Sequence, residues 1–400
     1  MALITPSKSH PEVVIQAVSA RDKKKAQEFA KANSIPEVRD SYEGMSIFSL
    51  SLSLSLSLSI SLSLSLTIQD ILNDPNIDCV FIPLPNALHY EWAVRAIRAG
   101  KHVLVEKPSV SNSTEAEVLF NLPELSQPNG PVLLEAFHSR FFPAWSLFRS
   151  LIDHNQVEHV NAYSMIPWWG TSKDDIHFNY PLSGGSIMAM GTYNMAALRM
   201  ALDAEPEECL SCDVHSYTDG IHDKCDYDFH AKFRFPNGAI GEASTTLKGP
   251  TYWTPSYLTV TQKEAAVPDA ALPPSQTKMR KRKLTLHGFV HGIFWHRIDI
   301  HDEYHIRDNA SGKVVRRWET TDQRKAYTFK EAGGEFAHLP GEPFWMSYRH
   351  QLEQFVNKVK GRETQHWISG EDSIAQMKMI DMAYEKSGLG PRPTSSFHGK

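Results

Sequence analysis

Cysteine is scarce in this sequence, and the first part of the chain has no glycine. Four cysteines occur in 400 residues, at Cys79, Cys209, Cys212 and Cys225, too few for the disulfide framework of a small secreted protein. The first glycine is Gly44, so no earlier turn lets backbone amides approach a phosphate closely. The first residues also lack the charged-then-apolar pattern of a signal peptide. We therefore expect a reduced, cytoplasmic location and no phosphate-binding turn in the first segment.

Charge of either sign is not in excess. The net charge of −5 gives no electrostatic reason to expect nucleic acid or an acidic membrane surface as a partner. The basic cluster 280–283 adjoins alternating leucine and threonine, and we interpret it as the solvated start of a strand. An apolar fraction of 41% at this length is enough for two domains with full cores.

A metal site is an alternative interpretation of the cysteines and histidines. Cys209 and Cys212, with two histidines and a third cysteine nearby, have a spacing found in zinc sites. Leu210, Cys212 and Val214, however, alternate as one face of a strand, and strand positions three apart point to opposite faces. A later histidine series has no accompanying pattern of residues that would orient the imidazoles toward a metal; its members are His287, His291, His296, His301 and His305. We therefore predict that the two cysteines diverge and that no metal is bound.

Residues 45–67 are dominated by alternating serine and leucine. As protein, this alternation predicts a long amphipathic strand with every leucine on one face, which is an aggregation hazard. As nucleic acid, a repeated CT dinucleotide translates into the same alternation. Our hypothesis is that the segment is a translated intron or a repeat expansion, with no function of its own. An inactive product of a faulty gene model is therefore one alternative for the whole chain.

The most informative stretch runs from Cys79 to Pro108. An apolar run, 79–82, is stopped by prolines, a helical pattern ends at Gly100, and a second apolar run covers 102–105. Strand, helix and strand in this order form one parallel crossover unit. Small molecules bind beyond the carboxyl ends of such strands. Pro108 biases Lys107 toward an extended conformation, from which its ammonium can orient a hydroxyl.

This arrangement closely resembles the glucose-fructose oxidoreductase / inositol dehydrogenase family of NAD(P)-dependent enzymes. The shared pattern is a strand, Pro-Asn-x-x-His, a helix, Ala-Gly-Lys-His-Val-Leu-Val and Glu-Lys-Pro. The resemblance implies that Lys107 is catalytic and that Asn86 and His89 lie near the nicotinamide end of the cofactor. It adds Pro83 and Glu106 to the cofactor-binding residues. The structural alternative is an exposed lysine at a strand end.

In the resembled family, a strand such as 13–18 and a helix such as 23–33 are the second strand and helix of a dinucleotide-binding domain. The first strand and its glycine-rich turn are expected upstream and are missing here. An NAD site offers a carboxylate after the second strand, whereas an NADP site offers a cation. Ser19 and Arg21 supply a hydroxyl and a guanidinium, so we expect NADP, bound weakly. Alternatively, Arg21 only caps the surface of the following helix.

A second motif, Leu-Glu-Ala-x-x-x-Arg-Phe-Phe-Pro at 134–143, resembles the dihydrodiol dehydrogenases and NADP-dependent D-xylose dehydrogenases within the family. It implies that His138 borders the substrate and that Arg140, at the passage to a second domain, is also a substrate residue. In a later loop, Trp168 offers an aromatic face to a sugar ring and Asp175 offers a carboxylate to its hydroxyls. We predict both as substrate contacts.

A third motif, residues 183–193, resembles the family's second signature, a Gly-Gly-initiated helix that carries the acid/base residue. That residue is tyrosine in the dihydrodiol and xylose enzymes, which gives the role to Tyr193. A phenol with an ordinary pKa of about 10 becomes a usable base when a lysine ammonium stabilises the phenolate. The family usually has an aspartate where this chain has Ala189, so a supporting carboxylate is missing. The structural alternative is a buried aromatic on a helix face.

Strand patterns recur from about residue 151 onward. Residues 229–235 alternate between apolar and polar, and Pro236-Asn237-Gly238 predicts a hairpin turn. We therefore expect an α/β protein in two parts. Residues 1–150 form a Rossmann-type NADP-binding domain without its first strand. Residues 151–400 form an α+β domain with a large, mostly antiparallel open sheet, which forms the dimer interface in the resembled family.

The resemblance implies an NADP-dependent oxidoreductase. Its expected substrate is a sugar, such as a D-xylose-like pyranose oxidised at the anomeric carbon to the lactone, or a cyclic trans-diol. The alternative from a different class is a non-catalytic regulator on the same fold that senses NADP or a sugar. We expect a homodimer, with no nucleic acid and no membrane among its partners.

Overall fold

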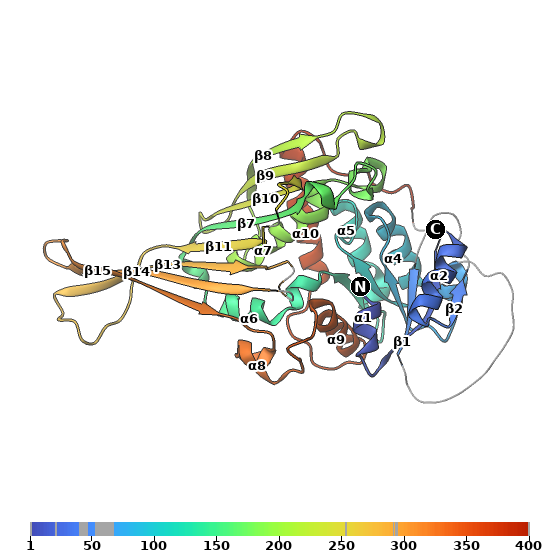
Figure 1. Cartoon of the computed structure of the whole chain (residues 1–400), viewed down its shortest axis with the longest axis horizontal. Helices are drawn as coiled ribbons and strands as arrows, with labels where there is room; N and C mark the ends of the chain where they lie inside the picture. Colours follow the sequence, from blue (N-terminus) through green and yellow to red (C-terminus); the bar gives the residue numbers. More distant parts are fainter. Residues whose placement is uncertain are drawn as a thin grey trace.

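The computed structural model describes residues 2–20, 22–39, 47–52, 68–252, 254–290, 292 and 295–398. Two sheets organise these residues, one of six strands and one of nine. Figure 1 shows the smaller sheet beside the N-terminal helices and the larger sheet extending away from them, with helices α7 and α10 against one of its faces. Long antiparallel strands form the far end of the larger sheet.

The first domain contains the parallel crossover unit that the sequence predicts. Its strands are β1 (Val13–Ser19), β2 (Glu37–Arg39), β3 (Ile47–Leu52), β4 (Cys79–Ile82), β5 (His102–Glu106) and β6 (Leu133–Ala136). Its helices are α1 (Ile4–Lys8), α2 (Lys23–Asn33), α3 (Ile68–Asn73), α4 (His89–Arg98) and α5 (Ser113–Phe120). The strands lie in the order β2-β1-β3-β4-β5-β6. Strands β4, β5 and β6 are parallel neighbours, and α4 connects the first two.

The serine-leucine segment contributes a strand to the centre of this sheet. Strand β3 pairs antiparallel with β1 on one side and with β4 on the other. The sequence predicts that β1 and β4 lack the strand that belongs between them and expose their backbone groups. That prediction is wrong, because β3 hydrogen-bonds to both. Its direction is nevertheless opposite to that of β1 and β4. The rest of the serine-leucine segment lies outside the described residues.

The second domain is built on the nine-stranded sheet, which is largely antiparallel as expected. Its strands are β7 (Val157–Pro167), β8 (Glu208–Ser216), β9 (Asp226–Arg234), β10 (Ile240–Gly249), β11 (Tyr257–Gln262), β12 (Ala265–Ala266), β13 (Gln276–His287), β14 (Arg297–Asp308) and β15 (Val314–Arg324). Only β7 and β10 pair in parallel among these described strands. The hairpin turn between β9 and β10 occurs where predicted, and Gly238 adopts a φ of 76° there, a conformation that glycine reaches without strain.

Helices close the second domain and connect it to the first. They are α6 (Pro143–Ser150), α7 (Thr192–Leu202), α8 (Phe329–Ala332), α9 (Ser347–Val359) and α10 (Gly370–Lys386), with a wide π-type turn, η8 (Ile187–Gly191), directly before α7. Helix α10 packs against α5 of the first domain as well as against α7 and β8. The apolar core is therefore continuous between the two sheets, and the end of the chain returns to the first domain (Figure 1).

Two details of the large sheet differ from the sequence expectations. The prediction that Cys209 and Cys212 diverge is wrong, because a bulge between Cys209 and Ser211 shifts the register and both thiols are buried in the same core. The basic cluster lies inside β13 and not at its start, and Arg282 forms an ion pair at 2.7 Å with Asp302 of β14.

The four cysteines are free and buried. In the part of the chain that the structure describes, no three His, Cys, Asp or Glu side chains gather as they would around a metal ion. Across the same residues, no helix has the length and apolar character needed to cross a membrane.

Candidate active site

A small cavity lies at the carboxyl ends of β4 and β5, the edge of the sheet where the sequence predicts ligand binding. Its volume is about 170 Å³. It is lined by Leu84, Pro85, Asn86, His89, Glu106, Lys107, Ile176, His177, Leu182, Gly184, Gly185, Met188 and Ala189. We call it the Lys107 cavity. Its walls come from both domains, so the loops after β4 and β5 and the start of η8 form it together.

Lys107 follows the last residue of β5 and is partly buried in the cavity wall. Its Nζ donates a hydrogen bond of 2.8 Å to the carbonyl oxygen of Ala189 and lies 4.7 Å from the ring centroid of Tyr193. Burial lowers the pKa of Lys107, while the carboxylates of Glu106 and Glu135 oppose that shift. The structure therefore brings the two predicted catalytic side chains together.

The hydroxyl of Tyr193 points toward His138. Its oxygen lies 3.0 Å from His138 Nε2, and His138 Nδ1 lies 2.8 Å from the hydroxyl oxygen of Ser347. Burial raises the pKa of Tyr193 well above its ordinary value of 10. The His138 imidazole also packs on the ring of Tyr348, with 3.9 Å between ring centroids. Tyr193 and His138, both predicted to contact the substrate, do not line the Lys107 cavity and instead begin a buried chain of polar groups that extends away from it.

The residues predicted near a nicotinamide take different positions. Asn86 lines the cavity and donates from Nδ2 to the carbonyl oxygen of Ser183 at 3.0 Å. His89 also borders the cavity, but its Nδ1 is 2.8 Å from the Pro108 carbonyl oxygen and its Nε2 is 2.7 Å from that of Leu84. Burial lowers the pKa of His89 to about 4, so the neutral ring donates to one carbonyl at a time. His89 therefore fastens the loop after β4 to the turn after β5.

Glu106 and Glu135 place two carboxyl groups close to Lys107. Glu106 ends β5 in the cavity wall, and burial raises its pKa while the neighbouring Lys107 opposes the shift. Glu135 is buried in β6, where it accepts hydrogen bonds from the Ser109 backbone amide at 3.0 Å and from the Ser373 hydroxyl at 2.6 Å. Burial raises the pKa of Glu135 to about 6.

Glu135→Gln should change how stability depends on pH. The carboxyl holds its proton more tightly in the folded state, so its contribution is present below pH 4.5 and is lost as the pH rises through about 6. We expect the variant, relative to the wild type, to gain about 2 kcal/mol of unfolding free energy between these limits. Urea denaturation at pH 4.5 and pH 7 measures this change. The exposed Glu117→Gln serves as control, and an equal offset at both pH values would contradict the prediction.

Ser19 and Pro83, two further predicted cofactor residues, do not line the cavity. The Ser19 side chain is fully buried, and its hydroxyl forms no hydrogen bond within the described part of the chain. In this arrangement it cannot reach a ribose, because solvent does not reach it. Arg21, the predicted NADP-selecting cation, lies outside the described residues.

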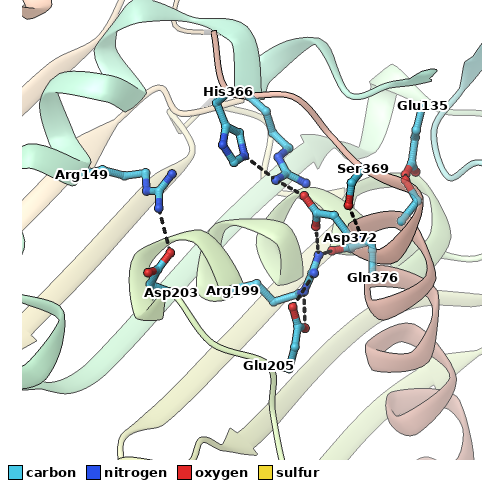
Figure 2. Close-up of polar contacts among 11 residues, drawn as sticks. Glu135, Arg149, Arg199, Asp203, Glu205, His366, Ser369, Asp372 and Gln376 are labelled. Atoms are coloured by element: carbon cyan, nitrogen blue, oxygen red, sulfur yellow. Dashed lines mark hydrogen bonds and ion pairs between the residues drawn. The ribbon is translucent and has the colours of Figure 1, made fainter. Parts of the chain in front are cut away.

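Arg140 lies in a separate polar cluster, away from the Lys107 cavity. Its guanidinium pairs with Asp372 and donates to His366 Nε2 at 3.0 Å. Figure 2 shows Asp372 also reaching Arg199, at 2.8 Å, on the far side of the cluster. The adjoining hollow of about 520 Å³ shares no lining residue with the Lys107 cavity. The structure thus gives Arg140 the role of joining α10 to the segment after β6 and does not bring it to the predicted substrate.

The two loop residues predicted as substrate contacts, Trp168 and Asp175, also lie outside the lining of the Lys107 cavity. Trp168 is 59% exposed and its Nε1 donates to the Thr251 hydroxyl at 3.3 Å, without lining the cavity. Asp175 accepts hydrogen bonds from the backbone amide and from Nδ1 of His177. His177, which does line the cavity, is a residue that the sequence did not single out. The only local sequence feature that could have indicated His177 is the Asp-x-His spacing shortly before the Gly-Gly turn.

The Gly-Gly turn is held by a buried ion pair that the sequence did not indicate. Arg392 donates to Asp226 at 2.6 Å and to the Gly184 carbonyl oxygen at 2.7 Å. Asp226 also accepts from the hydroxyl of Ser186 at 2.6 Å. Gly185 adopts a φ of 136°, and an added Cβ would lie 2.2 Å from the Asp226 carboxylate. Residues at the end of the chain therefore fix one wall of the Lys107 cavity.

The site fits one end of a nicotinamide dinucleotide better than the other. An amide, an ammonium and a carboxyl group border a small cavity at the carboxyl edge of the sheet, which suits a nicotinamide ring and a hydroxyl substrate. At the phosphate end, the first glycine among the described residues is Gly100, at the opposite edge of the sheet. The backbone cradle that accepts a pyrophosphate is therefore not formed by the described residues.

This two-sheet architecture matches known protein-family models. The model of the GFO/IDH/MocA oxidoreductase family, NAD-binding Rossmann fold, matches residues 2–126, and the model of the GFO/IDH/MocA C-terminal domain matches residues 149–266. The chain belongs to the GFO/IDH/MocA oxidoreductase family. The two matches fall on the two sheets, and the resemblance inferred from the Lys107 motif is confirmed.

Relatives within the GFO/IDH/MocA family act on sugars and diols by name. The D-xylose 1-dehydrogenase (NADP(+)) 2 of Haloferax volcanii is 24% identical over 97% of this chain and 94% of that protein. The trans-1,2-dihydrobenzene-1,2-diol dehydrogenase of Xenopus laevis is 25% identical over 52% of this chain and 54% of that enzyme. The chain spans less than half the length of other curated relatives that it matches.

Solved structures share the fold of this GFO/IDH/MocA chain. A 3-ketoreductase of Actinomadura kijaniata, in complex with NADP and TDP-benzene, superposes with a TM-score of 0.64 at 18% identity and covers 96% of this chain and 92% of its own. Such an identity supports a common fold, and function is argued below from the site itself.

Proposed function

We propose that this chain oxidises a secondary hydroxyl of a sugar or of a cyclic trans-diol, with NADP as the hydride acceptor. A D-xylose-like pyranose oxidised at its anomeric carbon would give the lactone. The observation that carries the proposal is the Lys107 ammonium at the carboxyl end of β5, in a small cavity beside Tyr193. The names of the Haloferax and Xenopus relatives support the substrate class, and NADP in the Actinomadura structure and in the Haloferax name supports the cofactor.

Lys107 acts on the substrate hydroxyl in this proposal. Its ammonium is a donor without lone pairs, so it binds the hydroxyl oxygen and stabilises the negative charge that develops there. It already donates to the Ala189 carbonyl oxygen, which leaves two N–H groups for the substrate. Bound beside Asn86 and Lys107 at the carboxyl edge of the sheet, the nicotinamide of NADP would supply the acceptor for the hydride from the carbon that bears the hydroxyl.

Tyr193 and His138 move the proton in this proposal. Burial holds the pKa of Tyr193 well above 10, so a free phenolate is costly. The phenol therefore passes its proton to His138 Nε2, 3.0 Å away, as its oxygen accepts the proton of the substrate hydroxyl. Tyr193 does not itself line the Lys107 cavity, so this step requires the substrate hydroxyl to extend past Lys107 to the phenol. For this, His138 keeps its own proton on Nδ1, which donates a hydrogen bond to the hydroxyl oxygen of Ser347. The tyrosine is never required to carry a full charge.

The test is NADP reduction, followed at the absorbance of NADPH, with D-xylose, other pentoses and trans-cyclohexane-1,2-diol. We expect slow but measurable reduction and an NADP affinity weaker than micromolar by titration, because the described residues form no pyrophosphate cradle. A lactone product from D-xylose identifies the anomeric carbon as the reaction centre. Absence of NADPH with every sugar and diol would overturn the proposed function, and micromolar affinity would overturn the expected weak binding.

A second candidate is a chain that binds a sugar without turnover, as a regulator or as an inactive product. The antiparallel direction of β3, in the position between β1 and β4, favours this candidate, because a strand of that direction cannot lead from the carboxyl edge into a phosphate-binding helix. Sugar binding without NADPH formation distinguishes it from the first. In either case we propose a homodimer through the open face of the nine-stranded sheet.

A further inference from the structure

His177 lines the Lys107 cavity, and neither it nor its partner Asp175 has a part in the proposed chemistry. Asp175 accepts hydrogen bonds from both the backbone amide and Nδ1 of His177. A carboxylate can only accept, so Nδ1 of His177 carries a proton, and in the neutral ring Nε2 is left as an acceptor. No partner for Nε2 occurs within the described part of the chain, and His177 lines the cavity together with Lys107.

The position of His177 is fixed by the turn that lines the same cavity. The Gly185 backbone amide donates to the His177 carbonyl oxygen at 2.7 Å. A Cβ added to Gly184 would lie 2.7 Å from that same oxygen, so the loop packs against the turn as only a glycine allows. On the other side, His222 lies 2.8 Å from the carbonyl oxygen of Phe178. A side chain supported in this way can recognise a ligand group with little cost of ordering.

The cavity therefore presents a donor and an acceptor on different elements. Lys107, after β5, can only donate, whereas Nε2 of His177 can only accept. The His177 side chain is 39% exposed, so a ligand with a single hydroxyl on Lys107 that shields Nε2 from water without donating to it is disfavoured. Two neighbouring hydroxyls satisfy both groups, one accepting from the ammonium and the other donating to the imidazole. Vicinal hydroxyls are the feature shared by pyranoses and 1,2-diols.

We propose that His177, oriented by Asp175, is a specificity-determining residue that binds the hydroxyl adjacent to the one undergoing oxidation. The proposal rests on the proposed function for the identity of the first hydroxyl. It identifies the preferred substrate class as polyols with two adjacent hydroxyls, over alcohols and deoxy sugars that lack the second one. No proton transfer is assigned to His177.

The test measures binding and turnover separately. Calorimetric titration of the full chain with D-xylose and with trans-cyclohexane-1,2-diol, without cofactor, gives the affinity for vicinal hydroxyls. Titration with cyclohexanol gives the affinity for a single one. His177→Ala should weaken binding of the vicinal compounds about tenfold to a hundredfold and leave binding of cyclohexanol unchanged. His177→Gln, which places an amide oxygen near the position of Nε2, should restore part of the affinity.

A matched control is available in the same domain. His215 lies 3.1 Å from Asp228 in a similar pair on strands β8 and β9, away from the cavity. His215→Ala should leave every affinity unchanged. Equal affinity of the wild type and His177→Ala for the vicinal compounds would overturn the proposal, as would a wild type that binds none of them. Binding with the expected selectivity but without NADPH formation would uphold it and overturn the proposed function alone.

Discussion

Lys107→Met is expected to lower turnover of sugar or diol at least about a hundredfold. Methionine has a similar length but no N–H group, so the substrate hydroxyl loses the ammonium of Lys107, the one Lys or Arg among the described residues that line the cavity. The hydrogen bond to the Ala189 carbonyl oxygen, 2.8 Å long in the wild type, is lost as well. The measurement is the steady-state rate of NADP reduction at saturating substrate, together with the unfolding midpoint to confirm that the variant is folded.

A matched control separates the role of Lys107 from a general effect of removing a lysine. Lys173 is 2.6 Å from Asp219 in an exposed ion pair on the loop that leads to the cavity, and it does not line the cavity. Lys173→Met should change turnover less than twofold, because exposed pairs contribute little. If Lys107→Met turned over substrate at the wild-type rate, the catalytic role of Lys107 would be refuted.

Arg392→Ala should lower the free energy of unfolding by about 3–5 kcal/mol. The side chains of Arg392 and Asp226 are both 0% exposed, and removal of the guanidinium leaves the Asp226 carboxylate charged and buried without its cation. The tie to the Gly184 carbonyl oxygen, 2.7 Å long, is lost at the same time. Urea denaturation at neutral pH measures the effect. Because this pair holds one wall of the Lys107 cavity, the affinity for sugar should fall in parallel.

Two further variants show that the loss comes from the unpaired charge. Arg234 pairs with Glu208 on the sheet surface, and both side chains are 46% exposed, so Arg234→Ala should cost at most about 1 kcal/mol. The double variant Arg392→Met, Asp226→Asn removes both charges and should regain part of the lost stability, since neutral groups of similar size carry a smaller desolvation penalty. A loss of less than about 1 kcal/mol in Arg392→Ala would contradict this account.

The local elements of the first domain could be predicted because each is encoded by adjacent residues. Strand β4 and strand β5 are short apolar runs, and their predicted bounds agree with the structure to within one residue. Helix α2 occupies Lys23–Asn33 as predicted. The spacing of apolar residues, together with the prolines and glycines that end each element, is enough to predict such elements. The position of Lys107 at a strand end follows from the same local pattern.

Strand β14 was missed, although it is among the longest strands of the large sheet. Its first half alternates the buried Ile298 and Ile300 with polar residues, whereas its second half, 303–308, mixes charged and polar residues on both faces, because the outer end of the ribbon that it forms with β13 and β15 imposes little apolar alternation. Pairing with β13 along its whole length and with β15 on its other side stabilises it. Two alternating isoleucines are too short a pattern to predict a strand of this length from the sequence.

By itself, the sequence determined the fold class, the family and the residues at the strand ends, since these depend on contacts between neighbours along the chain. The tertiary structure alone decided which side chains meet. Ser347 reaches His138 from 209 positions away, and Arg392 reaches Gly184 from 208 positions away. The same packing removed Arg140 from the cavity and brought His177 into it. Such contacts depend on how helices and loops pack against one another. No local sequence pattern indicates this packing, because the residues that meet are distant along the chain.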